Sequence, residues 1–206
     1  MTLAAVLLAG GESRRMGCDK AALLLNGIPL WQRQIALLRQ LSPAEVLVSA
    51  RVQPAWLPAD ARFIADAPPA RGPLGGVAAA LEATSATHLL ALAIDLPAMS
   101  AAHLAALWRA ASPGRGVLPW LEDRAEPLPA IYPAEASPIA SGLRAGQDFS
   151  VRALAHALIA AGRMTRYPIP AADAALYANC NSPADWQRHI LNSAGQSLHP
   201  GSRRVG

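Results

Sequence analysis

The chain has 206 residues, of which 52% are hydrophobic and 16% charged, and its formal net charge is +4. This length suits one domain with one core, and no apolar run approaches the ~18 residues of a membrane span, so a soluble, cytoplasmic protein is expected. The two cysteines have no metal-like spacing and cannot form a disulfide framework. The arginines are scattered, with no basic cluster before Arg203 and Arg204, so we do not expect nucleic-acid binding.

The first half of the chain alternates strand patterns with helix patterns. Leu3 to Leu8 is a continuous apolar run, typical of a strand buried on both faces. The elements predicted after it are strands at 45–49, 62–65 and 88–94, and helices at 29–41, 77–85 and 100–111, with Pro29 in the first helical turn and Ser100 as an N-cap. Strands and helices in this order predict a parallel sheet with helices on both faces, an α/β fold.

The pattern changes after residue 112. Segments 117–120 and 128–132 predict a hairpin around 122–125. The elements predicted beyond it are a helix at 151–161, a strand at 165–169 and a helix at 182–191. Residues 193–206 are rich in Gly, Ser and Pro, which is typical of a flexible tail. We therefore expect a single domain over residues 1–192, with a small mixed or antiparallel part near its C-terminus.

A glycine-rich loop follows the first strand and contains the only lysine of the chain. Of the 18 basic residues, 17 are arginine and one is Lys20. An ammonium approaches a phosphate as a compact point charge, whereas guanidinium is a broad planar fork. Gly10 and Gly11 let backbone N–H groups approach a phosphate or a base, and three side chains add donors, namely Ser13, Arg14 and Arg15. The spacing is neither that of a Walker loop nor G-x-G-x-x-G. The alternative is a plain turn with solvated arginines, which the buried strand before it disfavours.

Polar or glycine residues stand where four strands are predicted to end, and ligands of open parallel sheets bind at such ends. These residues are Gly10, Ser49, Asp66 and Asp95. A carboxylate after an apolar strand is costly unless a cation meets it, and Mg²⁺ prefers one or two carboxylates with phosphate oxygens and water. Asp95 is therefore the metal candidate, because Ser100 is the better cap for the next helix. Asp66 is expected to orient a ribose or base, or else to cap its loop.

Asn179 and Asn181 lie just before the last predicted helix. Their amides suit a polar ligand, but Asn181 or Ser182 could equally be only the N-cap of that helix. The five histidines show neither a catalytic triad nor a metal-ligand spacing, so no role is assigned to them.

These motifs resemble a known family. The run from Leu8 to Lys20 (LAGGESRRMGCDK) is similar to the signature of nucleotidyltransferases related to molybdenum cofactor guanylyltransferase. Four further segments are similar to the same family, namely 25–32 (LNGIPLWQ), Asp66 with 72–76 (GPLGG), 95–97 (DLP) and 179–183 (NCNSP). The resemblance covers most of residues 3–190.

The resemblance implies a Rossmann-like, three-layer nucleotidyltransferase fold. It implies an Mg²⁺-dependent enzyme that transfers GMP from GTP to the terminal phosphate of molybdopterin or molybdenum cofactor, and releases pyrophosphate. The roles it implies are guanine contacts for the backbone of Leu8, Ala9 and Gly10, phosphate binding for Lys20, nucleotide binding for Asp66, Mg²⁺ binding for Asp95, and pterin contacts for Asn179 and Asn181. It also implies transient contact with cofactor-biosynthesis proteins or apo-molybdoenzymes.

Two positions depart from the family pattern and leave alternatives open. Ser49 stands where the family often has Asn, and Glu126-Pro127-Leu128 stands where it often has a His-Pro-Thr-like segment. One alternative is a cytidylyltransferase acting on the same cofactor, but that branch typically has Ala in place of Gly10. The other is a non-catalytic nucleotide-binding partner of molybdoenzymes, which would not need both Lys20 and Asp95.

Overall fold

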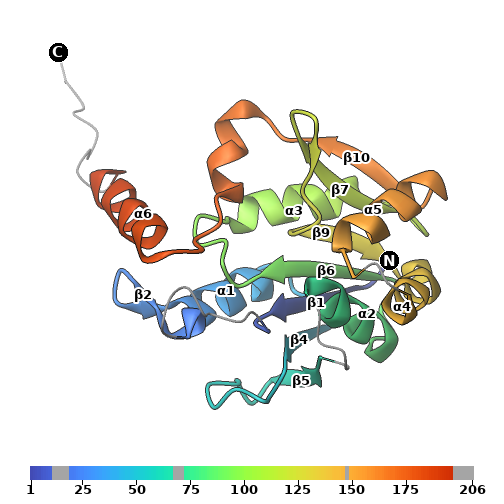
Figure 1. The fold of residues 1–206 in the computed structure, drawn as a ribbon, viewed down its shortest axis with the longest axis horizontal. Helices are drawn as coiled ribbons and strands as arrows, with labels where there is room; N and C mark the ends of the chain where they lie inside the picture. The colour runs from blue at the N-terminus through green and yellow to red at the C-terminus, as the bar shows by residue number, and fades with distance from the viewer. Residues whose placement is uncertain (11–18, 67–71, 147–148, 197–206) are drawn as a thin grey trace.

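A twisted sheet forms the middle of the molecule (Figure 1). The computed structural model describes residues 1–10, 19–66, 72–146 and 149–196. Within these residues the sheet has eight strands in the order β10-β7-β9-β6-β1-β4-β5, with β8 paired to β7. The strands are β1 (Leu3–Leu8), β4 (Glu45–Ala50), β5 (Ala61–Ala65), β6 (His88–Ala93), β7 (Gly116–Leu121), β8 (Arg124–Ala125), β9 (Ala130–Pro133) and β10 (Met164–Pro168).

Helices cover both faces of this sheet. The α-helices are α1 (Leu30–Arg39), α2 (Pro73–Ala83), α3 (Ala101–Ala110), α4 (Ser137–Ala145), α5 (Val151–Ala160) and α6 (Pro183–Gln196). Shorter elements are the 3-10 helices η1 (Lys20–Ala22), η2 (Ala134–Ala136) and η3 (Ala171–Tyr177), and a small antiparallel pair of β2 (Leu24–Leu25) and β3 (Ile28–Pro29). Among the described residues no helix is both long enough and apolar enough to cross a bilayer.

Most strand pairs are parallel. Strand β1 pairs in parallel with β4 and β6, β4 with β5, and β7 with β10. Strand β9 runs antiparallel between β6 and β7, and β8 is antiparallel to β7. The predicted fold class, a mainly parallel sheet with a small antiparallel part late in the chain, is confirmed.

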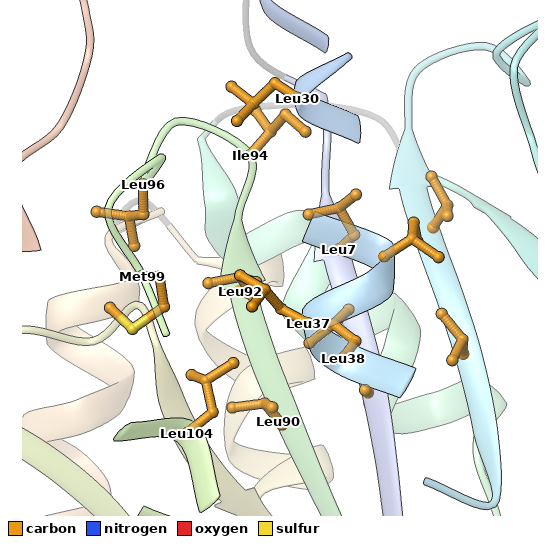
Figure 2. Close-up of a cluster of buried hydrophobic side chains, with 14 of the residues drawn as sticks. Leu7, Leu30, Leu37, Leu38, Leu90, Leu92, Ile94, Leu96, Met99 and Leu104 are labelled. Atoms are coloured by element: carbon orange, nitrogen blue, oxygen red, sulfur yellow. The ribbon is translucent and has the colours of Figure 1, made fainter. Parts of the chain in front are cut away.

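The two faces of the central strand pack into two separate hydrophobic layers. Leu3, Ala5 and Leu7 of β1 join the layer formed with α1 and α3, whereas the alternate residues of β1 join the layer formed with α2, α4 and α5. Figure 2 shows Leu7 beside Leu37 and Leu38 of α1 in the first layer. A strand buried on both faces needs a continuous apolar run instead of alternation, which is the pattern that predicted β1.

The start of helix α2 differs from the prediction. The helix begins at Pro73, not at Val77, so its first turns contain Gly75 and Gly76. Glycine disfavours a helix interior, but an ideal Cβ on Gly76 would lie 2.5 Å from Ser49 Oγ. Close packing of α2 on β4 therefore explains a glycine that local propensity assigns to a loop.

The late hairpin is also arranged differently. The two predicted hairpin strands do pair antiparallel, at Val117 and Ile131. However, β7 turns at Glu122 into the two-residue strand β8, and β9 pairs along its whole length with β6. Pro29 lies in β3, immediately before α1, and not in the first helical turn. Helix α4 and helix η3 were not predicted, and α6 extends to Gln196, beyond residue 191.

The single domain over 1–192 and the flexible tail stay predictions, since residues 197–206 lie outside the described part.

Candidate active site

A cleft of about 500 Å³ opens beside the carboxyl ends of β1, β4, β5 and β6. Eight residues selected from the sequence line it, namely Leu8, Ala9, Gly10, Lys20, Ser49, Asp66, Asp95 and Asn179. A ninth, Asn181, contacts the side chain of Lys20. Four further candidates lie outside the described residues, namely Gly11, Ser13, Arg14 and Arg15. The structure thus brings together candidates from segments far apart in the sequence, while the roles assigned to them remain predictions.

Backbone hydrogen bonds between adjacent strand ends hold the rim of this cleft. The N–H of Ala9 donates to the carbonyl oxygen of Ser49 (2.8 Å), and the N–H of Ile94 donates to that of Leu8 (3.1 Å). The N–H of Asp66 bonds in the same way to the end of β4. These bonds continue the parallel pairing by one residue past each strand, so Ala9, Ile94 and Asp66 are held at the rim of the cleft.

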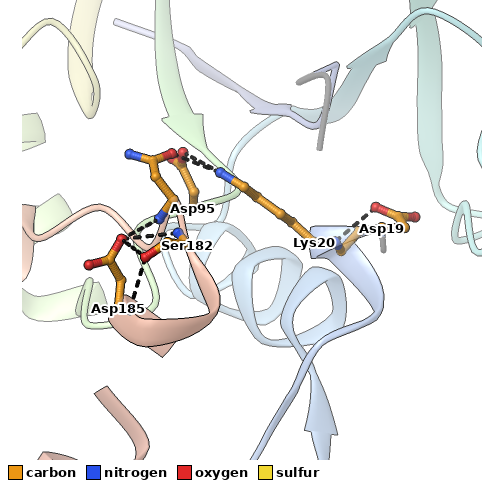
Figure 3. A network of polar contacts seen from close by, with 7 residues as sticks. Asp19, Lys20, Asp95, Ser182 and Asp185 are labelled. Carbon is orange, nitrogen blue, oxygen red and sulfur yellow. Dashed lines mark hydrogen bonds and ion pairs between the residues drawn. The ribbon is translucent and has the colours of Figure 1, made fainter. Parts of the chain in front are cut away.

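The ammonium of Lys20 joins two other candidates (Figure 3). Its Nζ donates to Asn181 Oδ1 (2.8 Å) and lies 3.3 Å from Asp95 Oδ2. The Lys20 side chain is 15% exposed and that of Asp95 is 23% exposed, so each charge needs its partner. Asp19 caps helix η1 by accepting a hydrogen bond from the N–H of Ala21 (2.9 Å), which sets the direction from which Lys20 enters the cleft.

The side chain of Asn181 can contact Lys20 because Ser182, and not Asn181, caps helix α6. Ser182 Oγ accepts from the N–H of Asp185 (3.2 Å), and Asp185 Oδ2 accepts from the N–H of Ser182 (3.0 Å), which is a reciprocal capping box. The hydrogen bond from the Ser182 hydroxyl lowers the pKa of the Asp185 carboxyl. The N–H of Cys180 donates to the carbonyl oxygen of Asp95 (2.9 Å). The segment before α6 is therefore fixed at both ends, and the cap is Ser182.

At the other end of the cleft, the hydroxyl of Ser49 donates to Asp66 Oδ1. Ser49 is buried, and its single donor is used in this bond. An ideal Cβ on Gly10 would lie 2.1 Å from Asp66 Oδ2. Any side chain at position 10 would thus displace the Asp66 carboxylate, so the absence of one leaves Oδ2 available as an acceptor.

The cleft also contains residues that the sequence reasoning did not select. Among them are Glu126, Ser150 and Arg152. Ser150 caps helix α5 by accepting from the N–H of Arg152 (3.1 Å), so the N-terminus of α5 lies at the cleft. A cation in the first turn of a helix is electrostatically unfavourable without an anion nearby. That position of Arg152 in a predicted helix is the signal that could have identified it.

A buried histidine anchors the segment that carries Asn179. A hydrogen bond of 2.7 Å joins His103 Nε2 of α3 to the hydroxyl of Tyr177, and His103 Nδ1 lies 3.5 Å from Asp173 Oδ2. Burial lowers the pKa of His103, and Asp173 opposes this shift. Burial also raises the pKa of Tyr177 well above its usual value, so both rings are neutral near pH 7. Their bond ties η3 to the body of the protein two residues before Asn179.

Known proteins share both the sequence pattern and the fold. The MobA-like NTP transferase domain matches residues 5–164. The chain belongs to this family. This MobA-like chain is 39% identical over 190 residues to a probable molybdenum cofactor guanylyltransferase of Opitutus terrae, covering 90% of this chain and 94% of the relative. It is 37% identical over 188 residues to a molybdenum cofactor guanylyltransferase of Xanthomonas euvesicatoria, covering 90% and 93%. The predicted family is confirmed.

Solved structures agree on the fold. Molybdopterin-guanine dinucleotide biosynthesis protein A from Archaeoglobus fulgidus superposes with a TM-score of 0.71 at 21% identity, covering 93% of this chain and 99% of that one. A 2-C-methyl-D-erythritol 4-phosphate cytidylyltransferase from Thermus thermophilus superposes with a TM-score of 0.66 at 20% identity, covering 92% and 98%. Because the fold also occurs in a cytidylyltransferase, it does not by itself select the base.

The neutral, buried His103 makes stability depend on pH. The pKa of His103 in the folded protein lies below the ordinary value of 6.5. As the pH falls below about 6.5, His103 therefore becomes protonated in the unfolded chain before it does so in the folded protein. The free energy of unfolding should therefore fall on going from pH 7 to pH 5, by at most about 1.4 kcal/mol per pH unit for this group. Urea denaturation of wild type and His103→Phe at several pH values measures the difference. His156→Gln, on the exposed side of α5, is the control and should keep the wild-type slope, whereas an unchanged slope in His103→Phe would contradict the assignment.

Proposed function

We propose that this protein transfers GMP from GTP to the terminal phosphate of molybdopterin or its molybdenum form, giving the guanine dinucleotide cofactor and pyrophosphate. The observation that carries the proposal is the contact between Lys20 and Asp95 within the cleft that Gly10, Ser49 and Asp66 also line. Relatives named molybdenum cofactor guanylyltransferase, at 37–39% identity over most of the chain, support the choice of base and acceptor.

The chemistry of Asp66 favours guanine over cytosine. The ring N–H and the adjacent amino group of guanine form a pair of donors, for which a carboxylate is a suitable acceptor. Cytosine offers one amino donor next to ring acceptors, and a carboxylate would repel the acceptors. Asp66 Oδ2 has room to accept from a base because Gly10 carries no side chain. Alanine at this position, which is typical of the cytidylyltransferase branch, would remove this arrangement.

The reaction is an in-line displacement at the α-phosphorus of GTP. A terminal phosphate oxygen of the acceptor forms the new bond to phosphorus, and the bond to the oxygen that bridges the α- and β-phosphates breaks. Pyrophosphate leaves with the electron pair of that bond, so no covalent enzyme intermediate is needed. Lys20 would exchange its contacts with Asp95 and Asn181 for phosphate oxygens and offset the negative charge that grows there.

Magnesium fits the donor set of the cleft. Asp95 supplies one partly exposed carboxylate, and the described residues contain no group of three or more side chains able to enclose a metal ion. Mg²⁺ suits such a site because it takes one or two carboxylates and completes its coordination with phosphate oxygens and water. Asp95 would hold the ion, which would neutralise charge on the triphosphate when bound.

The acceptor would occupy the part of the cleft lined by Asn179 and Arg152. A guanidinium binds phosphate oxygens in a bidentate manner, and the amide of Asn179 can both donate and accept hydrogen bonds with a pterin. The same proposal includes a cytoplasmic location and transient contact with cofactor-biosynthesis proteins or apo-molybdoenzymes, since the product is a cofactor used by other proteins.

Pyrophosphate release with each nucleoside triphosphate tests the reaction directly. The protein is incubated with molybdopterin, Mg²⁺ and GTP or CTP, and we expect release that requires both GTP and molybdopterin. CTP-selective release would instead identify a cytidylyltransferase. Tight GTP binding without any release would identify a non-catalytic binding protein, and either result would overturn the proposal.

The lone lysine should not tolerate replacement by arginine. Lys20→Ala is expected to lower the single-turnover rate by roughly 10²–10³-fold, the scale for loss of one charge that stabilises the transition state. Lys20→Arg should not restore the rate, because the planar fork does not fit a point-charge site. Arg39→Ala, at the far end of α1 and paired only with exposed Asp60 among the described residues, is the matched control and should react at the wild-type rate. A wild-type rate for Lys20→Arg would remove the special role of the ammonium.

Asp95→Asn tests the metal. We expect it to lose the magnesium-dependent part of the activity while keeping the wild-type circular dichroism spectrum, because an amide oxygen is a much weaker ligand than a carboxylate. The measurement is a magnesium titration of pyrophosphate release, with exposed Asp60→Asn as the control. Equal activity of Asp95→Asn and wild type across the titration would exclude Asp95 from the metal site.

A further inference from the structure

The cleft contains a carboxylate to which neither the family signature nor the reaction above assigns a role. Glu126 lies in the link between β8 and β9, lines the cleft and is only 9% exposed. A buried carboxylate is costly without donors. In a cleft that would receive a triphosphate and a phosphorylated acceptor, it would also repel the ligand phosphates. Its position therefore favours a ligand group that donates hydrogen bonds over a ligand phosphate.

Arg124 and the backbone of Pro119 hold Glu126 in place through one carboxylate oxygen and the backbone N–H. Arg124 Nε donates to Glu126 Oε1 (2.7 Å), and Arg124 Nη2 lies 2.6 Å from the same oxygen. The backbone N–H of Glu126 donates to the carbonyl oxygen of Pro119 (2.9 Å), which continues the β7–β8 pairing. Within the described parts of the chain no hydrogen bond reaches Oε2. Arg124 orients the carboxylate from the solvent side, and Oε2 can accept from a ligand.

The sheet order separates Glu126 from the proposed guanine end. Asp66 follows β5 and Ser49 belongs to β4, on one side of β1, whereas Asp95 follows β6 on the other side. Glu126 lies farther along the same direction, between β8, which pairs with β7, and β9, which pairs with β6. Glu126 and Asn179 both line the cleft. Asp95 is thus flanked by Asp66 on one side and by Glu126 on the other.

We propose that Glu126 binds the amino and ring N–H edge of the pterin of the acceptor, and so selects a 2-amino-4-oxo-pyrimidine ring there. The inference rests on the proposed function. Guanine and pterin present the same pair of donors, so one cleft that joins them needs two acceptors of the same kind. An in-line reaction places the attacking acceptor oxygen and the leaving pyrophosphate on opposite sides of the α-phosphorus. The guanine and the pterin are each joined to that phosphorus through a separate linker, so they would occupy separate parts of the cleft, and the carboxylates of Asp66 and Glu126 lie on opposite sides of Asp95.

Binding of simple pterins tests this without turnover. The probes are 6-hydroxymethylpterin and 6-hydroxymethyl-lumazine, which differ in that an oxo group replaces the 2-amino group in the latter. Calorimetric titration of wild type should give at least about tenfold tighter binding of the pterin, and Glu126→Gln should weaken pterin binding by roughly 10–100-fold, the scale of one hydrogen bond to a charged group. Equal affinity of wild type for both probes, or no binding of either, would overturn the proposal.

Two controls separate recognition from a structural effect. Arg124→Gln removes the ion pair but keeps the Glu126 carboxylate, so it should retain the preference for pterin. The same loss in Arg124→Gln as in Glu126→Gln would show that the hairpin, not the carboxylate, matters. GDP affinity should change less than about twofold in Glu126→Gln. A large loss of GDP affinity with unchanged pterin affinity would assign Glu126 to guanine and overturn the proposal.

The outcome is distinguishable from that of the proposed function. If pyrophosphate release fails while wild type still prefers pterin over lumazine and Glu126→Gln does not, the transfer reaction is wrong and the pterin site stands. If release occurs with GTP and molybdopterin but Glu126→Gln binds the pterin as tightly as wild type, the reaction stands and the inference about Glu126 is wrong.

Discussion

The shared contact of the Lys20 ammonium with Asp95 and Asn181 is the interaction around which the candidate site is built. It joins the start of η1, the residues after β6 and the link before α6, which are separated by up to 161 positions in the sequence. Each of the three is also fixed locally: η1 by the cap of Asp19, the β6 end by pairing to Leu8, and the α6 link by the Ser182 cap. Local fixing reduces the entropy lost when the long-range contact forms.

The sheet determines which charges can meet. Parallel neighbours β5, β4, β1 and β6 deliver their carboxyl ends to one edge, so residues after these strands are side by side although the chain between them is long. The antiparallel strand β9 breaks this rule, and the link that leads into it brings Glu126 to the same cleft from the opposite chain direction. Because the sheet is mixed, one side of the cleft is lined by residues after parallel strands and the other side by the link before the antiparallel strand β9.

Much of this arrangement could be predicted because its causes are local. A continuous apolar run identifies β1, and a polar residue directly after an apolar strand identifies Asp95. The features that were missed have non-local causes. Gly76 is helical because α2 packs on Ser49, β9 pairs with β6 and not mainly with β7, and η3 is held by the bond between His103 and Tyr177. Glu126 reads as a surface turn residue until its burial is known.

The Lys20–Asp95 contact also bears on selectivity for the ligand. A partly buried ion pair must be replaced by an equal or better set of interactions before either member binds anything else, since an unpaired charge there is costly. A triphosphate that carries a divalent cation supplies both at once, anionic oxygens for Lys20 and a cation for Asp95. A free base, a nucleoside or a metal ion alone satisfies at most one of the two. In the proposed reaction this pairing would discriminate against partial ligands, and the carboxylates of Asp66 and Glu126 would distinguish the rings at the two ends.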